Sequence, residues 1–274
     1  MNVLNQYKLD KELAIITGGA GLLGIQHCEG LLEAGAQVIA VDIDISSMKL
    51  ENLRNSYKKK FNFYKCDISK ESEIIKLKET IHKDYERHPS ILINNAAIDP
   101  KQEVKGERNS SRLESFDIDQ WNKEVAVGLN AAMICTKHFG IEMANENKGV
   151  ILNISSDLGL IAPNQSLYES EDLEDQLQNV KPVTYSVIKH GLIGLTRYIS
   201  TYWANKGVRC NALAPGGVYN GHSDEFVSKI NNLIPLGRMA KKDEYRSAIQ
   251  FLCSDASSYM NGQNIVIDGG RSIL

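Results

Sequence analysis

The sequence lacks the cysteine and histidine patterns that mark several large classes of protein. Its five cysteines are odd in number, scattered and without Cys-x-x-Cys spacing, which argues against a disulfide framework and a cysteine-based zinc site. The six histidines form no His-x-x-x-His pair or His/Cys cluster, so we expect no metal site. Unpaired cysteines within expected strands and helices are typical of core residues in a reducing compartment, and we expect a cytoplasmic protein.

Long basic and long apolar stretches are also missing. The net charge is −3 and the pI is near 6.1, and the one basic run, Lys58–Lys60, lies where a helix is expected to end. Neither nucleic acid nor an anionic membrane is therefore an expected partner. The first residues do not combine a basic segment with an apolar one, and the apolar runs are far shorter than the roughly 20 residues that span a bilayer.

The chain does contain a regular alternation of strand and helix patterns, with no Gly/Ser/Pro-rich linker, so we expect one domain over residues 1–274. Strands alternating with helices predict right-handed crossovers and a parallel, doubly wound α/β sheet of Rossmann type, with ligands at the carboxyl ends of the strands. The expected strands are 13–16, 37–41, 61–66, 91–93 and 208–213, and the expected helices are one ending near 34 and those at 47–57, 71–87, 121–147, 184–206 and 243–254.

A glycine-rich turn, Thr17–Gly24, separates the first strand from the first helix. Glycines here let the backbone approach a pyrophosphate, whose charge is met by N–H groups at the helix N-terminus, although the same pattern fits a plain tight turn. Asp42 ends the second strand, about twenty residues further on, where a carboxylate binds the ribose hydroxyls of NAD and repels the 2′-phosphate of NADP. We therefore expect NAD as the cofactor, and we interpret Asp44 as an exposed turn residue.

Tyr185 and Lys189 are four residues apart in an expected helix and project from one face of it. A fixed cation beside a phenol favours phenolate and brings the pKa of the tyrosine toward the working range of an acid–base catalyst. Ser156, upstream, carries a hydroxyl that can hydrogen-bond the oxygen of a carbonyl or alcohol. These three groups suit carbonyl/alcohol interconversion, whereas an amphipathic helix with a solvated lysine is the simpler alternative.

Seven motifs follow one another in an order that resembles the short-chain dehydrogenase/reductase family, in its compact branch, over nearly the whole chain. They are the glycine turn, Asp67 after the third strand, Asn-Asn-Ala-Ala (94–97), Asn-Ile-Ser-Ser (153–156), Tyr-x-x-x-Lys, Asn-Ala-Leu-Ala-Pro-Gly-Gly (211–217) and the closing segment 262–270. The resemblance implies that Ser156 orients the substrate oxygen, that Tyr185 is the acid/base, and that Lys189 holds the nicotinamide ribose. The cofactor-binding residues that it implies are Gly18, Gly21, Leu23, Gly24, Asp42, Asp67, Ile68, Asn94, Ala96, Tyr185, Lys189, Pro215, Gly216 and Val218.

The chain departs from the family pattern at two places. The spacing of Gly18, Gly21 and Gly24 is similar to that of the extended branch, although the length and the other motifs are those of the compact branch. Gly128 occupies the position at which the family usually has an active-site asparagine, and Asn130 follows two residues later. Either the helix register differs and Asn130 substitutes, or the water-mediated proton relay is absent.

Two segments, 98–116 and 157–183, are longer than a minimal fold needs, and we expect them to cover the substrate together with residues 219–239. In the second, Tyr168 and the acids Glu169, Glu171 and Asp172 suit a polyhydroxylated substrate better than a lipid, and a disordered polar excursion is the alternative. His222 and Arg238 could meet an anionic substrate but are more often surface residues, and His190 is expected to point off the catalytic face.

The sequence thus predicts an NAD-dependent oxidoreductase that acts on a secondary alcohol or ketone of a sugar or sugar phosphate. A weaker resemblance links it to bacterial oxidoreductases of flagellin modification and surface-sugar biosynthesis. A 3-oxoacyl reductase and a non-catalytic NAD-binding protein are the alternatives. The family also implies a homotetramer or homodimer that pairs through helices 121–147 and 184–206.

Overall fold

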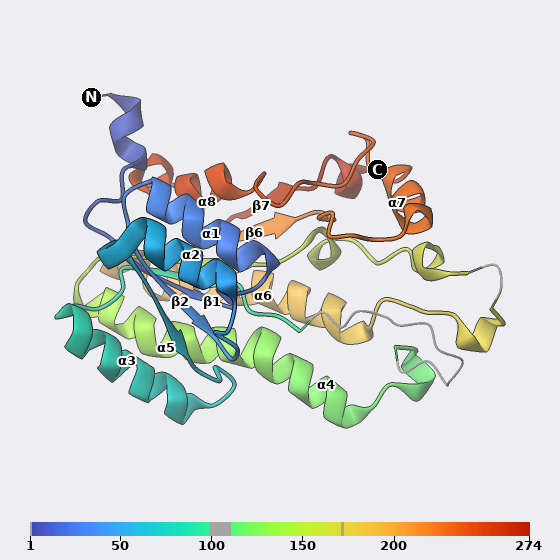
Figure 1. Ribbon diagram of the computed structural model, residues 1–274, viewed down its shortest axis with the longest axis horizontal. Coiled ribbons are helices and arrows are strands. Elements are labelled where there is room, and N and C mark those ends of the chain that lie inside the picture. Colours follow the sequence, from blue (N-terminus) through green and yellow to red (C-terminus); the bar gives the residue numbers. More distant parts are fainter. Residues whose placement is uncertain (1, 99–110, 171–172) are drawn as a thin grey trace.

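A seven-stranded parallel sheet forms the centre of the protein in the computed structural model, which describes residues 2–98, 111–170 and 173–274 (Figure 1). The strands run in the order β3-β2-β1-β4-β5-β6-β7, and every neighbouring pair is parallel. The expected doubly wound α/β fold is confirmed. Their bounds are β1 Leu13–Thr17, β2 Gln37–Asp42, β3 Phe61–Lys65, β4 Ile91–Asn94, β5 Gly149–Ile154, β6 Val208–Pro215 and β7 Asn264–Ile267.

The central strand β1 shows why the sheet is covered on both sides. Its five residues are all buried. Ala14 and Ile16 belong to the core on one face of the sheet, and Leu13 and Ile15 to the core on the other. A strand without a polar face is stable only between two layers of helices, as in other parallel sheets.

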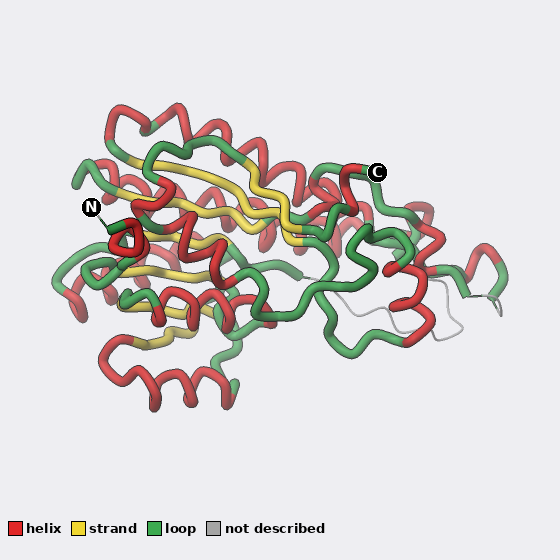
Figure 2. The backbone as a smooth tube through the Cα atoms, turned by 90° about the horizontal axis from the view of Figure 1, so that it is seen from above, coloured by secondary structure: helices red, strands yellow, loops and turns green. Residues whose placement is uncertain are grey.

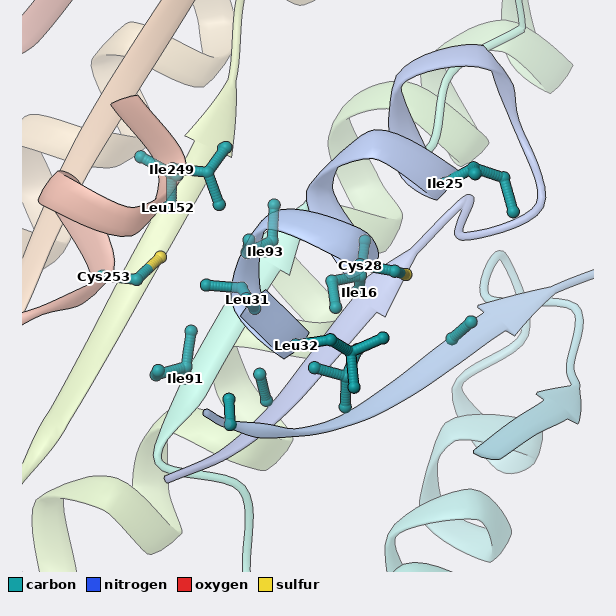
Figure 3. Packing of buried hydrophobic residues seen from close by; sticks show 14 of the residues in the cluster. Ile16, Ile25, Cys28, Leu31, Leu32, Ile91, Ile93, Leu152, Ile249 and Cys253 are labelled. Atoms are coloured by element: carbon teal, nitrogen blue, oxygen red, sulfur yellow. The ribbon is translucent and has the colours of Figure 1, made fainter. Parts of the chain in front are cut away.

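Each face of the sheet is covered by its own set of helices. On one face lie α1 Leu22–Glu33, α2 Met48–Tyr57 and α8 Arg246–Cys253, and on the other α3 Glu71–Tyr85, α5 Ala131–Asn145 and α6 Val183–Tyr202. Figure 3 shows the first of these layers, in which Cys28 and Leu31 of α1 pack over Ile16 of β1. The five cysteines are free and buried, and no helix in the described part of the chain is long and apolar enough to cross a membrane.

The long helix expected at 121–147 is interrupted. It consists of α4 Ile118–Val125, one π-helical turn Ala126–Asn130, and α5. The helix expected at 184–206 ends earlier, at Tyr202, and is followed by a 3₁₀ turn that closes at Gly207 with a φ of 65°. The remaining helix, α7 Asp224–Asn231, lies within the segment 219–239 that was expected to cover the substrate.

Candidate active site

The glycine turn after β1 closes against the end of β4. Gly18 has a φ of +64°, and a side chain there would meet the Ala96 backbone at 2.7 Å. Asn95 fixes this approach, because its Nδ2 donates to the carbonyl oxygens of Thr17 and Gly18, each at 3.0 Å. A side chain at Gly24 would overlap the Gly18 carbonyl oxygen, so α1 can begin this close to the strand only with glycine there.

The N-terminus of α1 opens toward this turn. Its N-cap is Gly21, and no side chain caps the first turn of the helix. Such a helix end presents unsatisfied N–H groups and the positive end of the helix dipole. The turn therefore has the chemistry needed to bind a pyrophosphate.

Asp42, at the end of β2, is held beside the glycine turn. Its Oδ2 accepts a hydrogen bond from Ala20 N at 3.0 Å, and its Oδ1 accepts one from Asp44 N at 3.3 Å. Asp44 itself is exposed, and the hydrogen bond from Ser46 N lowers the pKa of its carboxyl. The two acids thus differ as the sequence suggested, with Asp42 beside the turn and Asp44 at the surface.

Asp67 lies two residues after β3 and Asn94 is the last residue of β4, and their side chains make different contacts. The Asp67 carboxylate accepts from Ser69 Oγ at 2.6 Å and pairs with Lys70 at 3.1 Å, and chiefly the Ser69 bond lowers the pKa of its carboxyl. Asn94 is buried, and its Nδ2 donates to Asn153 Oδ1 at 2.8 Å. The Asn94 side chain therefore belongs to the interior of the sheet, and the buried Ile68 is likewise enclosed.

The segment that follows β6 contacts β7 and the stretch of chain before α8. Gly216 N donates to Ile267 O at 2.9 Å, and a side chain at Gly216 would come within 2.7 Å of Asp268 Cα. Val218 forms an isolated bridge with Ala240. Pro215, Gly216 and Val218 are thereby fixed at the same edge of the sheet as the glycine turn.

Tyr185 and Lys189 lie in the first turns of α6, beside the end of β5. The Lys189 Nζ donates to Ile154 O at 2.8 Å and lies 5.6 Å from the centre of the Tyr185 ring. Ser155 Oγ donates to Lys189 O at 2.8 Å and so joins the end of β5 to this helix. The expected pairing of ammonium and phenol is present.

A second ammonium group, which the sequence analysis did not single out, lies on the Tyr185 ring. Lys181 Nζ is 3.9 Å from the ring centre, and Lys181 N donates to Gln165 Oε1 at 2.8 Å. Lys181 precedes the first residue of α6, Val183, so helical spacing gave no reason to relate it to the tyrosine. Both ammonium groups thus lie within cation–π distance of the Tyr185 ring.

Ser156 follows β5 and is enclosed, with 5% of its surface exposed. Its Oγ donates to Oδ1 of the next residue, Asp157, at 2.8 Å and accepts from Leu158 N at 3.2 Å. The serine hydroxyl is thus fixed by its own 3₁₀ turn, Asp157–Gly159.

The π-helical turn brings Gly128 against α6. Gly128 is buried, and a Cβ there would meet Ile188 Cγ2 at 2.7 Å, so the close approach of the two helices requires glycine. Asn130 is exposed. Position 128 therefore offers no side chain for a proton relay, and an exposed Asn130 is a poor substitute.

The segment 157–183 contacts both of the other segments that were expected to cover the substrate. Leu167 packs with Ile230, Ile234 and Met239 from 219–239 in a small apolar cluster, and Lys229 Nζ donates to Glu169 O at 2.7 Å. We call the four apolar residues Leu167, Ile230, Ile234 and Met239 the Leu167 cluster.

The same segment also contacts the end of the first expected covering segment, since Arg112 Nη1 donates to Asp175 O at 2.6 Å and Val180 N donates to Ser111 Oγ at 3.1 Å. The described parts of the three segments lie at one end of the molecule, on the right in Figure 1, and extend beyond the strands in Figure 2. Residues 99–110, Glu171 and Asp172 lie outside the described residues.

The three other polar residues noted in the sequence make local contacts. The His222 ring stacks on Phe226 with ring centres 5.1 Å apart, and Arg238 pairs with Glu244 at 2.6 Å. His190 is exposed, and its Nδ1 lies 2.9 Å from Ser186 O.

The chain is similar to known proteins over nearly its whole length. The family model "short chain dehydrogenase" matches residues 12–170, and the model "Enoyl-(Acyl carrier protein) reductase" matches residues 173–272. A 2-dehydro-3-deoxy-D-gluconate 5-dehydrogenase of Pseudoalteromonas atlantica is 28% identical over 98% of both chains. A sorbose reductase of Candida albicans is 30% identical over 98% of this chain and 90% of its own, and a 3-oxoacyl-(acyl carrier protein) reductase of Aquifex aeolicus is 29% identical over 97% and 99%.

Two solved structures have the same fold over nearly the whole chain. A short chain dehydrogenase of Leptospira borgpetersenii with bound NAD⁺ superposes with a TM-score of 0.82, at 28% identity over 99% of this chain and 96% of that one. A gluconate 5-dehydrogenase of Burkholderia cenocepacia in complex with NADP and tartrate has a TM-score of 0.85 at 24% identity, with both chains fully covered.

Proposed function

Because the chain belongs to the short-chain dehydrogenase/reductase family of oxidoreductases, which act on CH–OH groups with a nicotinamide cofactor, we propose that it interconverts a secondary alcohol and a ketone of a sugar or sugar phosphate, with NAD. The observation that carries this proposal is the arrangement at the end of β5. There the Tyr185 phenol lies beside the Lys189 ammonium, and the enclosed hydroxyl of Ser156 follows the same strand.

Tyr185 is the group that moves the proton. A bound nicotinamide supplies the hydride acceptor for oxidation or the hydride donor for reduction. Tyr185 takes the proton from the alcohol oxygen during oxidation and returns it during reduction. The ammonium groups of Lys189 and Lys181 favour its phenolate form. Ser156 hydrogen-bonds the substrate oxygen and steadies the negative charge that develops there.

The residues at the strand ends fit a dinucleotide. The uncapped N-terminus of α1 would bind the pyrophosphate, and Asp42 would accept the ribose hydroxyls. The preference for NAD rests on Asp42, because its carboxylate would lie close to the doubly charged 2′-phosphate of NADP. Solved relatives are named with NAD⁺ and with NADP, so they favour neither dinucleotide.

The sugar-like substrate is supported by the polar character of the covering segments and by the names of two relatives. A pocket of about 380 Å³ lies between these segments and the start of α6, and its lining combines apolar side chains with the polar groups of Ser111, Arg112, Glu114, Gln165 and Lys181. The apolar side chains of the Leu167 cluster pack against one another, whereas a 3-oxoacyl reductase needs an open apolar groove for its chain. Relatives named for a deoxygluconate derivative and for sorbose agree with the sugar proposal.

A substrate screen tests the proposal. Formation of NADH is followed with a panel of sugars, sugar acids and sugar phosphates, and oxidation of NADPH and NADH is followed with a 3-oxoacyl thioester. We expect NAD-dependent turnover of a polyhydroxylated member of the panel. Turnover of the thioester alone would favour the acyl reductase, and cofactor binding without any turnover would favour a non-catalytic protein.

We also propose that two copies pair through α4–α5 and α6, as the family resemblance implies. Apolar side chains on these helices are exposed, namely Met133, Ile141, Val187, Tyr198 and Tyr202. Gly194 on α6 has open space above it, so a second helix could approach closely.

The free, buried cysteines suit the reducing cytoplasm in which we expect the protein to act.

A further inference from the structure

A buried ion pair lies behind Ser156. Asp157 Oδ1 accepts a hydrogen bond from the Ser156 hydroxyl. Asp157 Oδ2 accepts one from Arg271 Nη1 at 2.8 Å. The side chains of Asp157 and Arg271 are only 3% and 7% exposed. Neither residue has a role in the reaction described above.

The position of Arg271 is set by the closing turn of the chain. The Asp268 carboxylate accepts from Gly270 N at 2.9 Å and from Ser272 N at 2.7 Å, and Gly269 and Gly270 have φ values of +69° and +90°. This turn directs Arg271 into the protein toward Asp157, more than a hundred positions earlier in the chain. The arginine is therefore placed by a folded structure.

Several charged or titratable groups surround Asp157. On α6, the Lys189 ammonium donates to Ile154 O. At the start of α8, burial and then the negative charge of Asp157 raise the pKa of Tyr245. In the closing turn, the Asp268 carboxylate accepts a hydrogen bond from Ser272 N, and the Arg271 guanidinium contacts the Asp157 carboxylate. Within the described residues, Arg271 is the cation in an ion pair with Asp157.

A carboxylate beside the serine would interfere with the reaction if its charge were not compensated. A buried, unpaired carboxylate either takes up a proton or keeps a charge that acts strongly in a medium of low dielectric. If charged, it would oppose the negative charge that develops on the substrate oxygen. If protonated, it would donate toward the serine and no longer accept from it.

We propose that Asp157 and Arg271 are positioning residues for Ser156, an inference that rests on the proposed function. Asp157 Oδ1 and Leu158 N hold the serine Oγ at a fixed point, and Arg271 keeps Asp157 an acceptor while neutralising its charge. When substrate binds, only the hydroxyl hydrogen turns, from Asp157 toward the substrate oxygen. The oxygen atom of the serine stays where the reaction needs it.

Substitution of Arg271 tests this inference with the substrate found in the screen. Arg271→Met should lower kcat about tenfold or more, with the KM for substrate and the Kd for NAD changed by less than about threefold, because the serine–oxygen contact strengthens in the transition state. Arg271→Lys keeps the positive charge and should retain more of kcat than Arg271→Met.

The double variant Asp157→Asn/Arg271→Met separates positioning from general stability. An asparagine Oδ1 can still accept from Ser156 and Leu158, and it carries no charge that needs a partner. We therefore expect the double variant to recover kcat to within about fivefold of wild type. Arg246→Met is the matched control, because it removes ion pairs to Glu29 and Glu33 that have no contact with Ser156. Its unfolding temperature should fall while its kcat stays near wild type.

Two results would overturn the inference. One is an Arg271→Met protein that folds, binds NAD and keeps kcat within about twofold of wild type. The other is a folded double variant that stays as slow as Arg271→Met. A wild-type protein that turned over nothing in the screen would instead contradict the proposed function, and the positioning role would fail with it.

Discussion

At the scale of single residues, Tyr185 is the most informative position. Tyr185→Phe removes the proton-transfer group without changing the shape of the ring, so we expect kcat to fall by about 10²–10⁴-fold and the Kd for NAD to change little. Steady-state kinetics and a fluorescence titration with NAD measure the two effects. Tyr7→Phe is a suitable control, since Tyr7 packs on Phe251 far from α6 along the chain. A Tyr185→Phe enzyme with the wild-type rate would disprove the role of the phenol.

Asp42 governs a second prediction. Asp42→Ala removes two ribose hydrogen bonds and one repulsive charge, so the ratio of the Kd for NADP to that for NAD should fall by about tenfold or more. Asp44→Ala, two residues further on and exposed, should leave the ratio unchanged. The test is to measure the Kd for NAD and for NADP with wild type, Asp42→Ala and Asp44→Ala. The same ratio of the two Kd values in all three proteins would mean that a residue other than Asp42 recognises the ribose.

His27 on α1 gives a prediction about pH. It is fully enclosed, neither ring nitrogen has a hydrogen-bond partner, and burial lowers its pKa to about 3. The histidine is therefore neutral in the folded protein but protonates near pH 6.5 when the chain unfolds. Below pH 6.5 the unfolded chain binds more protons, so stability decreases with falling pH, by about 1.4 kcal/mol per unit.

The variant His27→Met should remove this dependence. Urea unfolding at pH 7.5 and 5.5 should show a loss for wild type that exceeds the loss for His27→Met by about 1 kcal/mol. His190→Gln, an exposed histidine, should behave like wild type. Equal losses in wild type and His27→Met would show that His27 binds its proton as readily in the folded protein as in the unfolded chain.

Local sequence patterns predicted some residues of the site but not others, and the difference has a physical reason. Helical spacing alone related Tyr185 to Lys189, and the distance along the chain from the glycine turn to a strand end singled out Asp42. Lys181 lies outside the helix, and Arg271, which follows β7, meets Asp157, which follows β5, more than a hundred positions earlier in the chain. Contacts of that kind arise from tertiary packing and leave no periodic signal.

At the scale of elements, the segment 157–183 carries the clearest prediction. Joining Ile161 to Val180 by a short glycine–serine linker should leave the Kd for NAD unchanged, because the glycine turn lies elsewhere. The value of kcat/KM for the true substrate should fall by about 10²-fold or more, since remote contacts no longer orient the reacting carbon.

A milder variant guards against misfolding of the shortened protein. Leu167→Ala leaves a cavity in the Leu167 cluster and should raise the KM for substrate several-fold while kcat changes less. A shortened protein that keeps kcat/KM within a few-fold would show that the segment is only tolerated surface.

The boundaries of the elements were predictable where sequence chemistry is local. The five strands with expected bounds end within two residues of those bounds, because Asp, Asn or Gly-rich turns follow apolar runs. The interruption between α4 and α5 was not predictable, because it depends on how closely Gly128 approaches Ile188 on another helix. A side chain at position 128 would force the two helices apart.

At the scale of the whole molecule, pairing of two copies is the main expectation. Tyr198→Glu together with Tyr202→Glu places two charges on exposed, stacked rings of α6 and should convert the assembly to a smaller species. Light scattering after size-exclusion chromatography measures the mass. Met48→Glu, which changes an exposed apolar residue on α2, is the control. Unchanged mass in the double variant would exclude this face of α6 from the interface.

Chemical labelling of the five buried thiols can also measure transient local unfolding of the protein. Cys28 and Cys253 lie in the core on one side of the sheet, and Cys66, Cys135 and Cys210 lie in the core on the other. Burial raises the pKa of Cys66 to about 11 and of Cys210 to about 12, so neither reacts appreciably as thiolate while covered. A thiol reagent can therefore label each cysteine only as fast as its own layer transiently unfolds, and the order of labelling would reveal which side of the sheet opens first.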